Sequence, residues 1–206
     1  MENIKVNIAR NGITTLATAG KYCAANVDVV VSVPEAEDGQ LAAQQALEDA
    51  VVQGTVQRYA NDRITQISNY AFQFQSNLVS ASCPSVRQVN IFSFFYCDKL
   101  AQVDMPALEY VGDSAFAQCT QLTTLDLPSA EVIDVEAFKG CANLSVLILR
   151  SPEVCYLFHH SAFTDTPIAS GVGFIYVPDA LVEQYKVAEN WSVYAGKIRP
   201  ISQLDT

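Results

Sequence analysis

The residues of this chain best suited to chemistry are its six cysteines and two histidines. Cys155 lies a few residues before the adjacent pair His159 and His160, and thiolate and imidazole groups are common zinc ligands. However, CxxC spacing is absent, adjacent histidine side chains usually diverge, and no fourth ligand is apparent. We therefore interpret these three residues as part of a loop, and we expect neither a metal nor another cofactor.

Three further cysteines, Cys97, Cys119 and Cys141, follow one another at a step of 22 residues. If each belongs to one coil of a stack, neighbours lie about 5 Å apart, which overlaps the Cα separation of a disulfide. A disulfide bond between two of these cysteines therefore remains an alternative. Side chains in register point in parallel rather than toward each other, so we interpret these cysteines as small buried hydrophobic residues.

No arrangement of residues typical of catalysis is present. Gly171-x-Gly173 precedes a predicted strand and lacks the third glycine of a nucleotide-binding loop, so we interpret it as a bulge or turn. We predict that the chain is not an enzyme.

The same 22-residue step governs the apolar residues, and it predicts the elements that position every other side chain. A period of this length indicates stacked units that bury their apolar faces against one another. Each unit reads as a short strand, one helical turn over Ala-Phe-x-x-Cys, and a second strand that ends at proline. The residues in phase are Phe72, Phe94, Phe116 and Phe138, then Leu78, Leu100, Leu122 and Leu144, and finally Pro84, Pro106 and Pro128.

The unit at residues 111–128, VGDSAFAQCTQLTTLDLP, resembles the BspA-type leucine-rich repeat. The resemblance covers roughly residues 60–150 and implies an α+β leucine-rich repeat solenoid of about five 22-residue units. Residues 166–179 and 190–195 resemble the C-terminal segment of leucine-rich repeat proteins encoded by phages and prophages of Firmicutes.

Changes in the sequence pattern along the chain predict that it is divided into four structural parts. Residues 1–34 form a small N-terminal β module, residues 35–53 a linker helix and residues 54–168 the repeats, with three residues inserted near 151–161. Residues 169–206 form a C-terminal cap, with Tyr185, Trp191 and Tyr194 on a helix after Asp179.

Residues between the apolar positions of each strand must face outward, and they form the candidate binding sites. On the second strands, Gln102 and Asp104 repeat in phase with Thr124 and Asp126. The two aspartates would repel each other at about 5 Å unless a cation or donor intervenes. In the next unit the same positions hold Val146 and Ile148, which we expect the cap or another subunit to cover. A second series on the first strands comprises Gln66, Gln88, Tyr110 and Val132.

Composition narrows the function. Half of the residues are hydrophobic and 17% are charged, which argues against disorder. The net charge of −10 argues against nucleic acid as a partner. No apolar run is long enough to span a bilayer, and no signal peptide is apparent. We predict a binding module for a protein or carbohydrate on a bacterial surface, synthesised in the cytoplasm and then part of a virion or released by lysis. A structural tail or baseplate component, with residues 1–52 holding copies together, and a surface adhesion protein are the alternatives.

Overall fold

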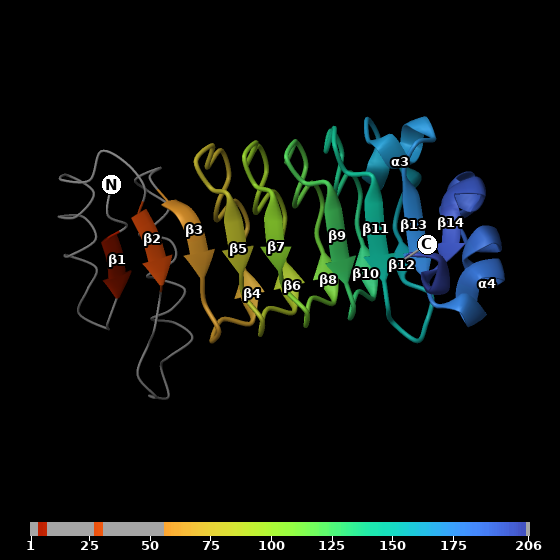
Figure 1. The fold of residues 1–206 in the computed structure, drawn as a ribbon, viewed down its shortest axis with the longest axis horizontal. Coiled ribbons are helices and arrows are strands. Elements are labelled where there is room, and N and C mark those ends of the chain that lie inside the picture. Colours follow the sequence, from red (N-terminus) through yellow and green to blue (C-terminus); the bar gives the residue numbers. More distant parts are fainter. Residues whose placement is uncertain (1–3, 8–26, 31–55, 205–206) are drawn as a thin grey trace.

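The structure, a computed structural model, describes residues 4–7, 27–30 and 56–204 of the chain. The predicted linker helix at 35–53 lies outside the described residues, as do Cys23 and most of the predicted N-terminal module. The described part is an elongated stack of coils whose strands run across the long axis (Figure 1). A solenoid of this kind places corresponding residues of successive units side by side.

The first strands of the units form one parallel sheet. Successive strands pair in register, so that Gln66 lies beside Gln88 and Gln88 beside Tyr110. The strands are β4 (Gln66–Ile67), β6 (Gln88–Val89), β8 (Tyr110–Val111), β10 (Val132–Ile133) and β12 (Tyr156–Leu157).

The second strands form two parallel sheets rather than one, because no pairing joins β7 to β9 in the described chain. The first sheet has the order β1 (Ile4–Asn7), β2 (Val27–Val30), β3 (Val56–Ala60), β5 (Ser80–Ser82) and β7 (Gln102–Asp104). The second has the order β9 (Thr124–Leu127), β11 (Val146–Leu149), β13 (Phe174–Val177) and β14 (Ile198–Pro200). Strands β1 and β2, which belong to the predicted N-terminal β module, thus extend the sheet of the repeats.

The predicted helical turn over Ala-Phe-x-x-Cys is wrong, because alternate N–H groups bond in two directions. In residues 70–75, Ala71 and Gln73 donate to carbonyls three residues back, at 3.2 and 3.1 Å. Phe72 and Phe74 instead donate to carbonyls of the next coil, at 2.7 and 2.8 Å. In a helix, all of these N–H groups would donate to carbonyls of their own segment. The segment therefore combines consecutive turns with part of a ladder between coils.

The repeated phenylalanines form a continuous column through the core. The rings of Phe72, Phe94 and Phe116 are stacked nearly parallel, with centroids 4.9 and 5.1 Å apart, and none of these residues is exposed. Phe138 and Phe163 continue the column at 5.8 and 5.6 Å. Each ring therefore packs against the coils on both sides, as the 22-residue step predicted.

The repeated cysteines are buried, as predicted, and their thiols have hydrogen-bond acceptors. The Sγ atoms of Cys97, Cys119 and Cys141 donate to main-chain carbonyls of the preceding coil at 3.0, 3.1 and 3.1 Å. All five cysteines of the described part are free, so the alternative of a disulfide is not realised there. Burial raises the pKa of Cys97 and of Cys141 to about 12.

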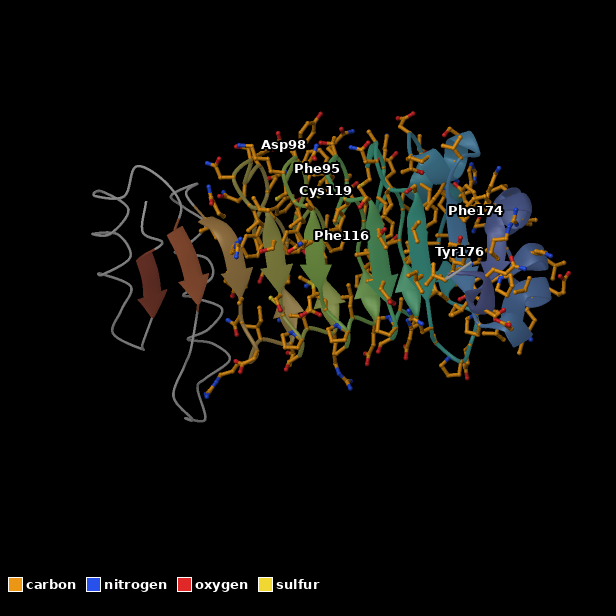
Figure 2. The ribbon with its side chains drawn as sticks, viewed as in Figure 1. Phe95, Asp98, Phe116, Cys119, Phe174 and Tyr176 are labelled. Carbon is orange, nitrogen blue, oxygen red and sulfur yellow. The ribbon has the colours of Figure 1, made fainter. Side chains whose placement is uncertain are left out.

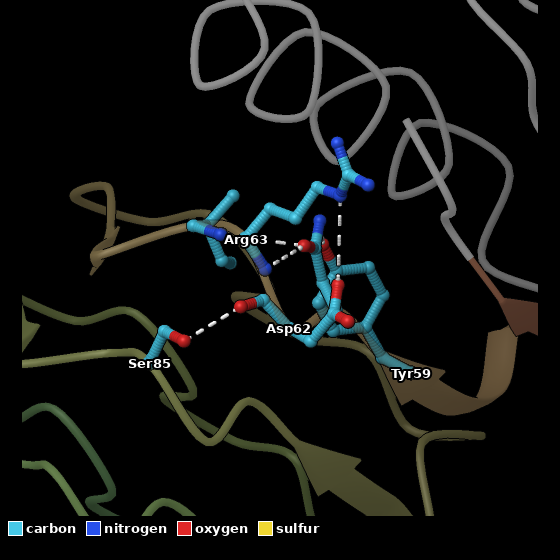
Figure 3. A network of polar contacts seen from close by, with 6 residues as sticks. Tyr59, Asp62, Arg63 and Ser85 are labelled. Atoms are coloured by element: carbon cyan, nitrogen blue, oxygen red, sulfur yellow. Dashed lines mark hydrogen bonds and ion pairs between the residues drawn. The ribbon is translucent and has the colours of Figure 1, made fainter. Parts of the chain in front are cut away.

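The first described coil is closed by a buried asparagine (Figure 3). The side-chain amide of Asn61 donates to the Tyr59 hydroxyl at 2.9 Å, and its oxygen accepts from the Arg63 N–H at 3.0 Å. Ser85 of the next coil donates to the carbonyl of Asp62 at 2.6 Å. The bend at residues 61 and 62 is thereby joined to the unit that follows it.

The C-terminal end consists of short helices that pack on the last coil. Tyr185 lies on α4, but Trp191 and Tyr194 do not, so the prediction of one helix for all three is wrong. The backbone becomes extended at Ala188, and Asn190 has a φ of 61° that no α-helix continues through. The elements are η1 (His160–Phe163), α3 (Pro167–Ser170), η2 (Asp179–Leu181), α4 (Val182–Val187), η3 (Ser192–Lys197) and η4 (Ile201–Gln203).

Candidate binding surface

The second-strand candidates are exposed but do not form one continuous series. Gln102 and Asp104 lie on β7, where they pair with Ser80 and Ser82 of β5. Thr124 and Asp126 lie on β9, in the other sheet. The structure therefore does not join the two pairs through a ladder, and the interruption falls between the strands that carry the two aspartates.

Each of these aspartates has a donor. The Ser82 hydroxyl donates to Asp104 at 2.8 Å. The guanidinium of Arg150 donates to both carboxylate oxygens of Asp126, at 3.0, 3.0 and 2.8 Å. The donor that the sequence required is thus supplied within the chain. Both carboxylates have lost part of their capacity to bind something else.

The apolar residues that follow on β11 are covered by the C-terminal segment, as expected. Val146 pairs with Phe174 of β13, and Ile148, which is buried, pairs with Tyr176. Figure 2 shows both aromatic residues beside the C-terminal strands. Arg199 of β14 lies over the Phe174 ring, 4.8 Å from its centroid. This face is therefore part of the cap contact.

The first-strand candidates form the predicted series. Gln88 is exposed and Tyr110 is half-buried. The Tyr110 hydroxyl donates to Asp134 at 2.7 Å, and burial, followed by that hydrogen bond, raises the tyrosine pKa to about 12. Val132 pairs in turn with Tyr156, which is 51% exposed. Because residues are inserted before Tyr156, it is out of phase with the 22-residue step, and the sequence therefore did not identify it as the last member of this series.

The main chain of Cys155 takes part in the contact between the last coil and the cap, whereas the side chain of His159 bonds within its own segment. The indole of Trp191 donates to the Cys155 carbonyl at 2.7 Å, and the Cys155 N–H donates to the Tyr185 hydroxyl at 2.9 Å. The Nδ1 atom of His159 accepts from a main-chain N–H at the start of η1, at 3.2 Å. Within the residues that the structure describes, no cluster of three metal-binding side chains occurs.

The most distinctive surface lies on the turns of the first two complete units. We call it the aromatic patch, and its members are Tyr70, Phe74, Phe92, Phe95 and Tyr96. Tyr70, Phe74 and Tyr96 are 53%, 60% and 46% exposed. Isolated apolar side chains on a surface are ordinary, but a contiguous group of aromatic rings marks an interaction site.

The rings of the patch hold one another. Phe95 packs edge-on against Phe92, Phe74 and Tyr96, with centroids 4.9, 5.7 and 4.7 Å away. Tyr70 stacks on Phe92 at 5.7 Å. In Figure 2, Phe95 lies near the edge where the coils turn, whereas the core residue Phe116 lies deeper. The patch is a rigid outer layer above the buried column.

The backbone beneath the patch disfavours side chains. Tyr70, Phe74, Phe92 and Tyr96 have φ values of 62°, 62°, 54° and 58°, in the left-handed region. Bulky residues are uncommon there, and the cost is about 1 kcal/mol or more for each. One unit farther along, the position of Phe74 and Tyr96 is Gln118, and after another it is Gly140. The fold itself therefore does not require an aromatic residue at this position.

A hollow of about 390 Å³ opens beside the patch. Its walls combine the rings of Phe74 and Tyr96 with polar groups from three successive coils. Among the lining residues the only ionisable carboxylate is Asp98, which is exposed, and none is basic. The lining residues are Phe74, Ser76, Tyr96, Asp98, Gln118 and Thr120.

The repeat interpretation missed this surface because it treated the whole Ala-Phe-x-x-Cys segment as structural. A signal was present in the columns beside the buried phenylalanine. The position directly after it holds Gln73, Phe95, Ala117 and Lys139 in successive units, so an aromatic residue occurs there once. Comparing such columns identifies side chains that the repeat does not need.

A model of the BspA type leucine rich repeat region matches residues 59–172 in 6 copies, more than half of the chain. The 22-residue spacing had predicted about five units. No curated protein matches the chain. In the part of the chain that the structure describes, no helix is long and apolar enough to cross a membrane.

Proposed function

The chain belongs to the BspA-type leucine-rich repeat family, and we propose that it is a non-enzymatic binding module for a protein or glycan on a bacterial cell surface. Stacked repeats suit this role because side chains of successive coils line up over an extended surface. The observation that carries the proposal is the aromatic patch. Tyr70, Phe74 and Tyr96 are exposed within a contiguous group of rings, and the left-handed position of Phe74 and Tyr96 holds glutamine or glycine in other units.

The site residues expected from sequence support the proposal less strongly. Asp104 and Asp126 are already bonded within the chain, and Tyr110 is bonded to Asp134. Gln88, Gln102 and Thr124 are exposed polar residues, and none of them lines the hollow beside the aromatic patch. We therefore propose that the principal contact with the ligand lies on the turns, and that the residues of the two strand series surround it.

Binding of fluorescently labelled protein to bacterial cells and purified cell walls tests the function. Phe74→Gly combined with Tyr96→Gly should reduce the bound fraction severely, because it removes the two exposed rings that line the hollow, at positions where glycine is unstrained. The matched control is Tyr156→Ala with Phe158→Ala, which removes two rings that are 51% and 55% exposed outside the patch. Failure of the wild-type protein to bind any cell or wall preparation, or an equal loss in the control, contradicts the proposal.

More specifically, we propose that a phage or prophage of Firmicutes encodes the protein, which is carried on a virion or released by lysis. It rests on the resemblance of residues 166–179 and 190–195 to proteins of that group. A bacterial surface adhesion protein is the alternative. Neighbouring tail and lysis genes would favour the first setting, and a neighbouring sortase or export gene would favour the second.

A structural role in a tail or baseplate is the second candidate function. The observation that favours it is the position of β1, which lies at the end of the first sheet, beyond β2 and β3, among the strands that the structure describes. A strand at a sheet end offers unpaired main-chain groups to another chain, which agrees with assembly of copies through residues 1–52. Light scattering should then give a mass above that of one chain, and a monomer would count against this role.

A further inference from the structure

We infer that the hollow beside Phe74 and Tyr96 binds a neutral sugar unit of a cell-surface polysaccharide. This inference rests on the proposed function and names the ligand class of the same surface. The hollow joins exposed aromatic faces to hydroxyl, amide and carboxylate groups within about 390 Å³, at the lower end of the usual range for ligand sites. That combination matches a pyranose ring, which has apolar C–H faces and a polar rim.

The aromatic part of the site is preorganised for stacking. The centroids of the Phe74 and Tyr96 rings lie 5.7 Å apart with 35° between the ring planes, and both rings line the hollow. Phe95 packs edge-on against both rings and holds them. The face of an aromatic ring carries partial negative charge, and the C–H groups of a sugar face carry partial positive charge. A sugar ring can therefore stack here without a large ordering cost.

The polar part of the site comes from three successive coils, which supply Ser76, Asp98 and the pair Gln118 and Thr120. Gln118 supplies an amide that both donates and accepts, and Asp98 supplies a carboxylate that accepts from hydroxyl groups. The Thr120 hydroxyl donates to the Asp98 carbonyl at 3.0 Å, which ties the two coils together at the rim. Gln118 lies against Gly140, where a Cβ would be only 2.2 Å from its amide nitrogen. The glycine therefore gives the Gln118 side chain its space.

Charge selects the type of sugar. Asp98 is the only charged residue of the lining, and the chain as a whole carries −10. Phosphate-bearing wall polymers and uronic acids would meet a carboxylate with no arginine or lysine in the hollow to compensate it. Neutral hexoses and N-acetylated hexosamines carry no such penalty. We assign the site to neutral units for this reason.

Affinity electrophoresis of the full chain through gels containing dextran, mannan, galactan or chitin oligosaccharide measures the sugar contact directly, with polygalacturonate as the anionic comparison. At least one neutral probe should retard the wild-type protein. Tyr96→Gly should weaken that binding about tenfold or more, equivalent to about 1.4 kcal/mol. Tyr96→Phe, which keeps the ring, should retain it. Retardation by polygalacturonate alone, or by none of the neutral probes, overturns the inference.

Treatment of cells separates this inference from the proposed function. Periodate, which cleaves the vicinal diols of hexose units, should abolish binding of the wild-type protein, or chitinase or lysozyme should do so where the unit is a 1,4-linked N-acetylated hexosamine, which has no vicinal diol; protease treatment of the cells should not. Binding that survives periodate but is lost after protease means a protein receptor, so the sugar assignment fails while the binding function stands. Binding to no preparation, treated or untreated, means that the proposed function itself fails.

Discussion

Substitution of two phenylalanines 20 residues apart, Phe74 and Phe94, should lower stability to very different extents. Phe94 is not exposed, and its ring lies between those of Phe72 and Phe116 at 4.9 and 5.1 Å. Truncation of a fully buried phenylalanine to alanine costs about 4 kcal/mol, because contacts are lost and a cavity remains. Since each coil contacts only its neighbours, Phe94→Ala also weakens both adjoining interfaces.

Phe74→Ala should cost far less. The side chain is 60% exposed, and its described ring contacts are those with Phe95 and Tyr96. Partly exposed contacts of this kind are worth about 1 kcal/mol. Alanine at a φ of 62° keeps the backbone strain, so that term does not change.

Urea unfolding followed by circular dichroism, with thermal unfolding as a second measurement, tests the contrast. For a chain of this size the melting temperature should fall by roughly 8–16 °C for Phe94→Ala and roughly 2–4 °C for Phe74→Ala. Cell binding should be lost only in the second variant under conditions where both are folded. If Phe74→Ala destabilises the chain as much as Phe94→Ala, the patch is part of the core, and the argument for a binding role is refuted.

Three further outcomes are expected. Gly173→Ala should lower the free energy of unfolding by about 2 kcal/mol, because the added Cβ would lie 2.7 and 2.9 Å from main-chain atoms. Gly196→Ala, whose Cβ would have no atom within 4 Å, should change it by less than about 0.5 kcal/mol, and equal effects of the two variants would contradict the packing. Stability should be full below pH about 8.5, where an unfolded thiol begins to ionise, and should fall as the pH rises toward 12, since burial raises the pKa of Cys97 and Cys141 to about 12. Urea unfolding between pH 8 and pH 11 should show a smaller fall in the Cys97→Ala/Cys141→Ala double variant, and an unchanged fall would count against the thiols. Asp126→Asn should cost less than about 1 kcal/mol, since the ion pair is half exposed, and it should leave cell binding intact; lost binding would move the site to the second strands.

Much of the core follows from the spacing of residues. The step of 22 placed Phe94, Leu100 and Cys97 in the interior, and all three are fully buried. It also placed Gln88 beside Tyr110, as observed. These predictions hold because stacked units repeat their environment, so that a residue in phase with a buried residue is itself buried.

Two parts of the structure did not follow from the pattern. Gaps of three and four residues around Phe116 suggested a helical turn, but the N–H groups alternate between their own segment and the next coil, which local spacing does not show. The cap strand β13 covers Ile148 through a pairing that spans the inserted residues, beyond the reach of a fixed period.

The sequence by itself determined the solenoid, its phase and the residues of its core, because a repeated apolar pattern has one way to bury itself in a stack. Only the tertiary structure decided which outward residues are available. In that structure Asp126 is bonded to Arg150, and Phe74 and Tyr96, from two coils, line one hollow. Partners and exposure depend on neighbouring coils, and the repeat leaves the surface of each coil free to differ.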